Sequence, residues 1–63
     1  MYLVLHDAIT GAEIFIRADS VEMVSTDDEL RRTRVLTSSG TAAWVQETPG
    51  SVVGLMLQEE ENV

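Results

Sequence analysis

The chain has 63 residues and a net charge of −7, from eleven acidic residues against four arginines, with one histidine and no cysteine. This composition excludes disulfides and thiolate metal sites, and one histidine is too few for the usual zinc ligand sets, so we expect no cofactor and no metal. The negative charge opposes contact with nucleic-acid phosphates and anionic membranes, and no apolar run is long enough to span a bilayer, so we expect neither partner and a cytoplasmic location.

The first part of the chain is predicted to form a β-hairpin and a third strand. Residues 2–6 are rich in strand-forming side chains, and the Asp and Gly of residues 7–11 are typical of a tight turn. Residues 12–17 complete the hairpin. After a bend at residues 18–20, the alternating pattern of residues 21–25 predicts the third strand.

A second hairpin is predicted in the middle of the chain. Residues 26–32 are polar and show no periodicity, which predicts an exposed loop. Residues 33–37 and 41–46 have the composition of two strands, and the loop between them, residues 38–40, ends in Gly. Gly is the usual residue where a hairpin loop needs a left-handed backbone.

The C-terminal part is predicted to form a short helix. Thr48 is a favoured N-cap residue, and Pro49 is favoured at the first helical position. The apolar side chains expected along this helix are Val52, Val53, Leu55, Met56 and Leu57. Three of them, Val52, Leu55 and Met56, have the i, i+3, i+4 spacing of one helical face. The other two widen that stripe, as expected for a helix between a sheet and a neighbour.

The end of the chain is acidic. Residues 59–61 are all Glu and would lie at the negative end of the helix dipole, which is unfavourable. We therefore expect the helix to stop or fray near Gln58, with a domain at residues 1–58 and an acidic tail at residues 59–63. The fold class predicted is mainly β (α+β), a small twisted sheet or partly closed barrel of about five strands with one short C-terminal helix.

Two strands are apolar on both faces. A sheet with one wet face should alternate apolar and polar residues, but Ile14, Phe15 and Ile16 are consecutive, as are residues 42–45 around Trp44. Outward aromatic side chains would indicate a contact with another chain, since aromatics are enriched in interface cores. The alternative is a sheet that closes on itself and buries both faces of these strands. The apolar surplus in so short a chain leads us to expect a homo-oligomer.

The candidates for catalysis are weak. His6 and Asp7 are adjacent strand residues, so their side chains are expected to point to opposite faces. A nucleophile, a base and an orienting group must converge for covalent catalysis, and no cysteine is present to pair with His6. We therefore do not expect an enzyme.

A pattern of apolar strands, glycine turns and a polar strand exit runs through nearly the whole chain. Its residues are Leu3, Leu5, Gly11, Val21, Glu22, Val24, Val35, Leu36, Gly40, Val45, Gln46, Glu47 and Thr48. This pattern resembles the FlbD/SwrD-like family of small flagellar and swarming motility proteins. The resemblance implies a noncatalytic accessory role in bacterial motility, carried out through protein–protein contacts.

The residues expected to contact a protein partner are Phe15, Trp44 and Glu47. Trp is frequent among interface hot spots because it buries a large area at little conformational cost, and Glu47 follows Trp44 at the strand exit. The competing interpretation makes Trp44 the largest side chain of the monomer core. An alternative function is a small acidic phage or bacterial interaction or inhibitor protein that occludes a basic surface on its target.

Overall fold

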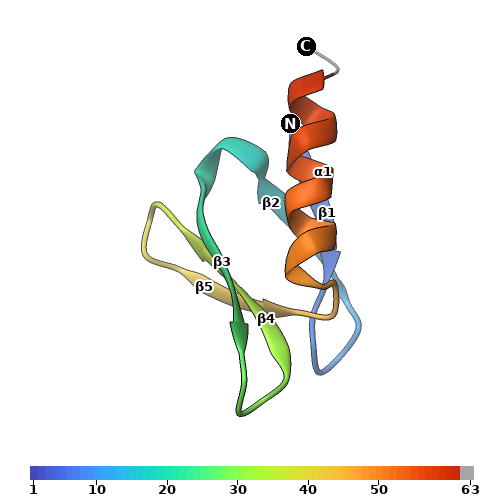
Figure 1. Ribbon diagram of the computed structural model, residues 1–63, viewed down its shortest axis with the longest axis vertical. Coiled ribbons are helices and arrows are strands. Elements are labelled where there is room, and N and C mark those ends of the chain that lie inside the picture. Colours follow the sequence, from blue (N-terminus) through green and yellow to red (C-terminus); the bar gives the residue numbers. More distant parts are fainter. Residues whose placement is uncertain (62–63) are drawn as a thin grey trace.

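The computed structural model describes residues 1–61, and within that range the chain forms five strands and one C-terminal helix (Figure 1). In chain order the elements are β1 (Tyr2–His6), β2 (Glu13–Arg17), the short 3-10 helix η1 (Ala18–Ser20), β3 (Val21–Asp27), β4 (Arg32–Thr37), β5 (Ala42–Val45) and α1 (Pro49–Glu61). The predicted mainly β (α+β) fold class is confirmed. The last two residues of the expected tail, 62 and 63, lie outside the described residues.

The strands form two antiparallel sheets that meet at one point. β1 pairs with β2, and the second sheet has the order β3-β4-β5. An isolated bridge between Asp7 and Val45 joins the end of β1 to the end of β5. Next to it, the Gln46 N–H donates to the His6 carbonyl oxygen at 2.8 Å. Among the described strands β2 and β3 do not pair with each other, so the two sheets form an open, bent surface.

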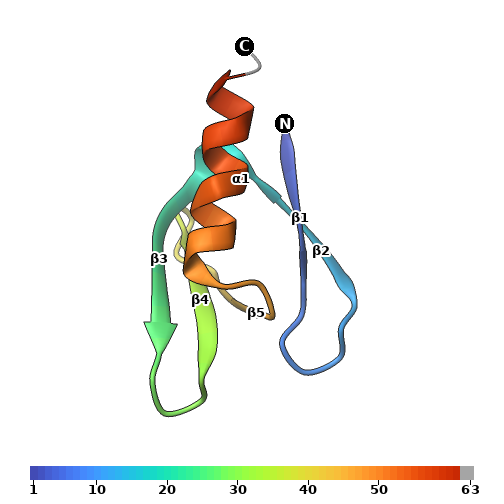
Figure 2. The same cartoon turned by 45° about the vertical axis from the view of Figure 1, so that its right-hand side comes forward.

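The core lies under α1, which packs against β1 and β3 and so covers the space between the two sheets (Figure 2). The side chain of Val52 is completely buried and is the helix's deepest contribution. Both sheets and the helix contribute to the core, whose buried apolar residues are Leu3, Leu5, Ile16, Val35, Val45 and Val52. Because every element but η1 and β3 supplies one of these side chains, the helix and the two sheets depend on one another for burial.

The apolar residues of β2 divide between two faces. Ile16 is buried and Ile14 packs against the core, whereas Phe15 between them is 61% exposed. Val4, directly opposite Phe15 on β1, is exposed as well. The alternative prediction, a sheet that closes on itself and buries both faces, is therefore wrong for this hairpin. The sheets stay open, and α1 covers one side only.

The turn of the first hairpin is confirmed. The Asp7 carboxylate accepts hydrogen bonds from the backbone N–H groups of Ile9 at 2.9 Å and Thr10 at 3.0 Å. These hydrogen bonds hold the pKa of Asp7 below its usual value, and the bond from Thr10 lowers the pKa more than the bond from Ile9 does. Gly11 has a φ of 74°, which glycine adopts without the steric cost that other residues meet.

The loop expected at residues 26–32 is shorter than predicted. β3 continues to Asp27 and β4 begins at Arg32, so only four residues connect the strands. Asp27 accepts a hydrogen bond from the Leu30 N–H at 3.2 Å, and Arg31 closes the turn with a φ of 53°. Asp27 is a typical turn residue, but Arg31 gives no signal for a left-handed backbone, so the sequence does not indicate how short this turn is.

The start of α1 is confirmed and its end differs from the prediction. The Ser51 N–H donates to the Thr48 hydroxyl at 3.1 Å, which is the geometry of an N-cap. The helix continues to Glu61, beyond the end expected near Gln58. An unfavourable charge at a helix end costs only about 0.3–1 kcal/mol, and the good intrinsic helix propensity of Glu offsets it.

The Thr48 cap gives a test of helix stability. Thr48→Ala leaves the Ser51 N–H without its partner and should lower the free energy of unfolding by about 1 kcal/mol in a urea titration. Thr48→Ser keeps the hydroxyl and should stay close to the wild type. Equal losses in the two variants would show that the methyl group, rather than the cap, is what stabilises the helix.

Candidate functional site

The outer face of the β1–β2 hairpin is apolar at its centre. Val4 and Phe15 lie directly opposite each other, and Tyr2, two residues from Val4, lies on the same face and is 57% exposed. Arg17 and Glu13 flank Phe15 on the same face of β2. Val4 and Phe15 thus lie between Glu13 and Arg17 along the strand, and Tyr2 lies opposite Arg17. We call the three exposed side chains of Tyr2, Val4 and Phe15 the hairpin patch.

Trp44 lies on the outer face of the other sheet and is partly packed. It pairs with Arg34 across β4 and β5, and its indole N–H donates to an Asp27 carboxylate oxygen at 3.4 Å. A shallow hollow of about 390 Å³ lies beside it, and Ile9 and Arg32 contribute to its lining. Trp44 is 36% exposed, so it is not one of the buried core residues. A contact between Trp44 and a partner stays a prediction.

The three predicted contact residues do not form one cluster. Phe15 is on β2 and Trp44 is on β5, and β1 lies between these strands because its end bridges to β5. Glu47 lies after β5, and both of its carboxylate oxygens are within hydrogen-bond distance of His6. A role for Glu47 in a partner contact stays a prediction. In the structure its carboxylate makes contacts within the chain, with His6.

The contact between Glu47 and His6 holds the segment before α1 against β1. The His6 backbone N–H donates to one Glu47 oxygen at 2.9 Å, and the His6 ring Nδ1 lies 2.6 Å from the other. Glu47 is two residues before Pro49, the first residue of α1. The contact therefore fixes both the junction of the two sheets and the point from which the helix starts.

The electrostatics of Glu47 follow from these contacts. Burial raises the pKa of Glu47, but the hydrogen bonds from the His6 side chain and backbone outweigh it and leave the pKa below its ordinary value of 4.5. The carboxylate is thus ionised at neutral pH and accepts both hydrogen bonds. The group is a positioning contact, because its oxygens are already occupied by His6.

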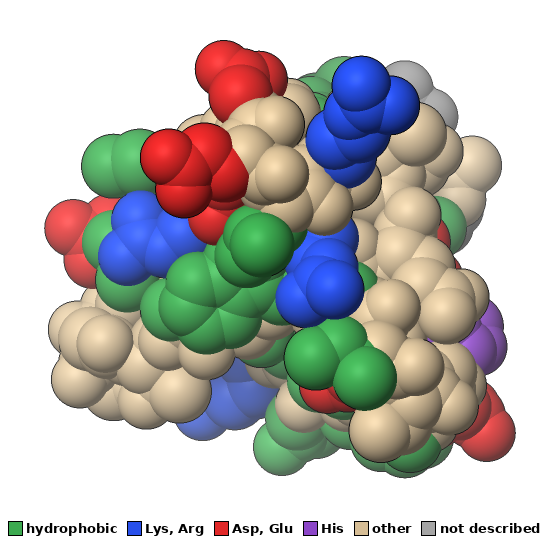
Figure 3. All heavy atoms as spheres, turned by 90° about the horizontal axis from the view of Figure 1, so that it is seen from below, with side chains coloured by type: hydrophobic (Ala, Val, Ile, Leu, Met, Phe, Trp, Pro, Cys, Tyr) green, Lys and Arg blue, Asp and Glu red, His purple; other side chains and the backbone are tan. Residues whose placement is uncertain are grey.

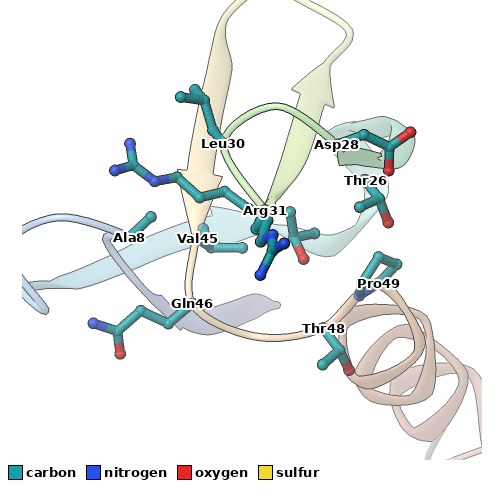
Figure 4. A pocket seen from close by; sticks show the side chains of 11 residues that line it. Ala8, Thr26, Asp28, Leu30, Arg31, Val45, Gln46, Thr48 and Pro49 are labelled. Carbon is teal, nitrogen blue, oxygen red and sulfur yellow. The ribbon is translucent and has the colours of Figure 1, made fainter.

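A hollow of about 620 Å³ opens between the β3–β4 turn and the segment before α1 (Figure 4). Arg31 and Leu30 from the turn line one side, and Gln46, Thr48 and Pro49 line the other. Among the residues that the structure describes, no three His, Asp or Glu side chains gather where they could hold a metal ion. The polar side chains that line the hollow are three threonines, two arginines, one aspartate and one glutamine.

Charges of both signs are interspersed at the end of the molecule that carries the β1–β2 and β3–β4 turns (Figure 3). Arginine side chains lie between acidic and apolar side chains on this face. Nucleic-acid interfaces are much more positively charged than protein interfaces. The mixture of both signs on this face differs from the positive surface of a nucleic-acid interface.

No family model matches the chain, and neither the curated proteins nor the solved structures compared with it gave a significant match. The resemblance to the FlbD/SwrD-like family therefore stays a prediction. Within residues 1–61, no helix has the length and apolar character needed to cross a membrane.

The contact between His6 and Glu47 is the part of this region that the sequence analysis missed. The two residues are 41 positions apart, and they meet because β1 runs beside the end of β5. Alternation within each strand gives no information about which strands of different hairpins are neighbours. A signal for this pairing would have to come from residue pairs that vary together among related sequences.

The pKa of Glu47 predicts a pH-dependent contribution to stability. A carboxylate whose pKa is lowered by folding stabilises the protein above its unfolded-state pKa, and the contribution is lost as the pH falls through the folded-state value. Glu47→Gln should lower the free energy of unfolding by about 1 kcal/mol at pH 7. This difference should shrink as the pH falls below 4.5.

Urea titrations of the wild type and variant at several pH values would measure this dependence. Glu29→Gln is the matched control, since Glu29 is exposed in the β3–β4 turn and should change little at any pH. A loss for Glu47→Gln that is the same at neutral and acidic pH would contradict an ionised, hydrogen-bonded Glu47.

Proposed function

We propose that this chain is a noncatalytic accessory protein that acts through protein–protein contacts in the cytoplasm, in flagellar or swarming motility as its family resemblance implies. The supporting observation is the hairpin patch, where Tyr2, Val4 and Phe15 are all exposed on one face. Removing apolar surface from water is favourable, and this is the main driving force of most protein–protein association. A partner with an apolar surface of its own would therefore gain most by binding here.

The composition of the hairpin patch supports a protein partner. Tyr and Phe are enriched at the centre of protein interfaces, and polar residues surround such centres. Here the apolar centre is flanked by Glu13 and Arg17, which can fix the orientation of a partner without the cost of burying a charge at the centre. Trp44 on the second sheet offers another anchor, with Arg34 opposite it.

Self-association is part of this proposal. A chain of 63 residues buries a small core, and only four of the six buried apolar side chains given for the described range are fully buried. Exposed apolar side chains on the hairpin would gain burial in a homo-oligomer. The same surface would then be shared between self-association and binding of another protein.

The net charge of −7 favours a second candidate, a small acidic inhibitor that covers a basic surface on its target. Such binding depends on long-range attraction and weakens steeply with added salt. Binding through the hairpin patch depends on apolar burial and should change little between low and physiological salt. The salt dependence of partner binding thus separates the two functions.

Phe15→Ala tests the proposed function. The variant should retain most of the wild-type stability, losing less than about 1 kcal/mol, because Phe15 is exposed and contributes mainly a cross-strand contact with Val4. In the source organism, deletion of the gene should reduce swimming or swarming. The wild-type gene should restore motility, and the Phe15→Ala gene should not.

Leu57→Ala is the matched control because it removes an exposed apolar side chain from α1, away from the hairpin. It should restore motility fully. Normal motility after deletion would refute the motility role, and full restoration by Phe15→Ala would refute the hairpin patch. For Trp44→Ala, both partner binding and the melting temperature should be measured. A variant that stays folded but loses binding identifies Trp44 as a contact residue, whereas an unfolded variant identifies it as a core residue.

A further inference from the structure

β2 has a free backbone edge. Among the described strands it pairs with β1 alone. The Ala18 N–H donates to the Met1 carbonyl at 3.0 Å, and the Asp7 N–H donates to the Ala12 carbonyl at 2.9 Å, just beyond the two ends of the ladder. In an antiparallel pair, backbone groups alternate between pointing to the partner and pointing away. With these two bonds fixed, the N–H and C=O groups of Glu13, Phe15 and Arg17 point away from β1.

The residues along this edge are self-complementary. β2 reads Glu13, Ile14, Phe15, Ile16, Arg17, with an acid and a base at equal distances on either side of Phe15. We propose that a second copy of this chain pairs with β2 in antiparallel orientation, about a two-fold axis at Phe15. This register places Glu13 of each copy opposite Arg17 of the other, and Phe15 opposite Phe15.

The same register satisfies the backbone. Residues directly opposite each other in an antiparallel pair exchange two hydrogen bonds when their N–H and C=O groups both point inward. With the axis at Phe15, Phe15 meets Phe15 of the second copy, and Glu13 meets Arg17. These are the three residues whose backbone groups point away from β1, so all three can form hydrogen bonds across the pair. A two-fold interface uses one surface on both copies, which is the commonest symmetry of soluble oligomers.

Within the described range, β1 and β5 each pair on one side only as well, and an isolated bridge joins their ends. The outer edge of β3 is less suited to pairing than that of β2. β3 also pairs on one side only among the described strands, but it has an irregularity between Val21 and Met23 where its register shifts. Bulges of this kind protect edge strands from pairing with another chain. β2 is regular over all five residues. The geometry therefore favours β2 over β3 as the strand that receives a second copy.

Arg17 is free to change its partner. In the single chain it forms an ion pair with Asp19 at 3.0 Å, and both side chains are exposed. Exposed ion pairs contribute little to stability. The Arg17 carbonyl accepts a hydrogen bond from the Ser20 hydroxyl at 2.8 Å, and its second lone pair can accept another from a paired strand.

The resulting dimer has a four-stranded sheet, β1-β2 followed by β2-β1 of the second copy, with two hairpin patches side by side on its outer face. This inference rests on the self-association in the proposed function and names its surface. A contact built on one five-residue strand per copy is small, and small interfaces are typical of weak complexes. We expect a dissociation constant in the micromolar range, with salt reducing the repulsion between two negatively charged chains.

Charge reversal tests this register. Glu13→Arg places two arginines opposite each other at both ends of the strand pair, and Arg17→Glu does the same with two acids. Each variant alone should dimerise about tenfold more weakly than the wild type, since two attractive cross-strand pairs become repulsive. The double variant E13R/R17E should regain wild-type dimerisation. A mixture of the two single variants should form a heterodimer, because every opposed pair is then attractive.

Sedimentation equilibrium measures these masses against the 6.9 kDa monomer. Glu29→Arg is the control for the change in net charge, and it should not weaken association. Hydrogen exchange adds a residue-specific measurement: the Phe15 amide should exchange more slowly as concentration rises, whereas the Ile14 and Ile16 amides, which pair with β1, should be protected at all concentrations.

Two results would overturn the proposal and differ in what they imply. A wild-type protein that stays monomeric through the micromolar range would refute this dimer together with the self-association in the proposed function. A wild-type protein that associates, with both single variants associating equally well, would refute pairing at β2 and leave self-association standing. Failure of the mixed variants to form a heterodimer would refute the two-fold register.

Discussion

The fold depends on the junction between β1 and β5. The bridge between Asp7 and Val45 and the hydrogen bond from Gln46 to His6 are the backbone contacts that turn a hairpin and a three-stranded sheet into one surface. Without them the two sheets would be connected through η1 and the shared core alone. Glu47 adds a side-chain contact at the same place, so the direction of α1 is set where the sheets meet. In so small a domain, one junction determines the placement of both the core and the outer surface.

The outer surface follows from this arrangement. α1 lies over the space between the sheets and contacts β1 and β3, so it covers the inner face and leaves the other side of every strand to solvent. Phe15 is exposed for this reason, although its neighbours Ile14 and Ile16 face the core. The apolar character of both faces of β2 therefore has two different causes. Its inner face completes the core, and its outer face is available for contacts with other molecules.

Features determined by neighbouring residues could be predicted from the sequence. The strands, the Asp7 turn and the Thr48 cap each depend on hydrogen bonds or side-chain patterns within a few positions. The left-handed backbone at Arg31 could not be predicted, since that residue type gives no signal for it. The helix end was placed too early because one unfavourable electrostatic effect was weighed above the propensity of the residues that follow.

The candidate site was predictable only in part, for a related reason. The consecutive apolar residues marked Phe15 and Trp44 as unusual, but alternation alone could not tell an exposed face from a second buried one. That question depends on whether the sheets close, which is decided by pairing between strands far apart in the sequence. The same pairing brings His6 to Glu47, so the role of Glu47 inside the chain also became visible only in three dimensions.

The distance along the chain between His6 and Glu47 has a consequence for the speed of folding. Each hairpin joins neighbouring segments and can form early, since closing a short loop costs little entropy. The junction links residues 41 positions apart, so it closes a longer loop at a higher cost in entropy. Contacts of long sequence separation slow folding, so docking of the first strand onto the last is expected to be the slow step. Until it occurs, the inner faces of both sheets remain open to water and to other chains.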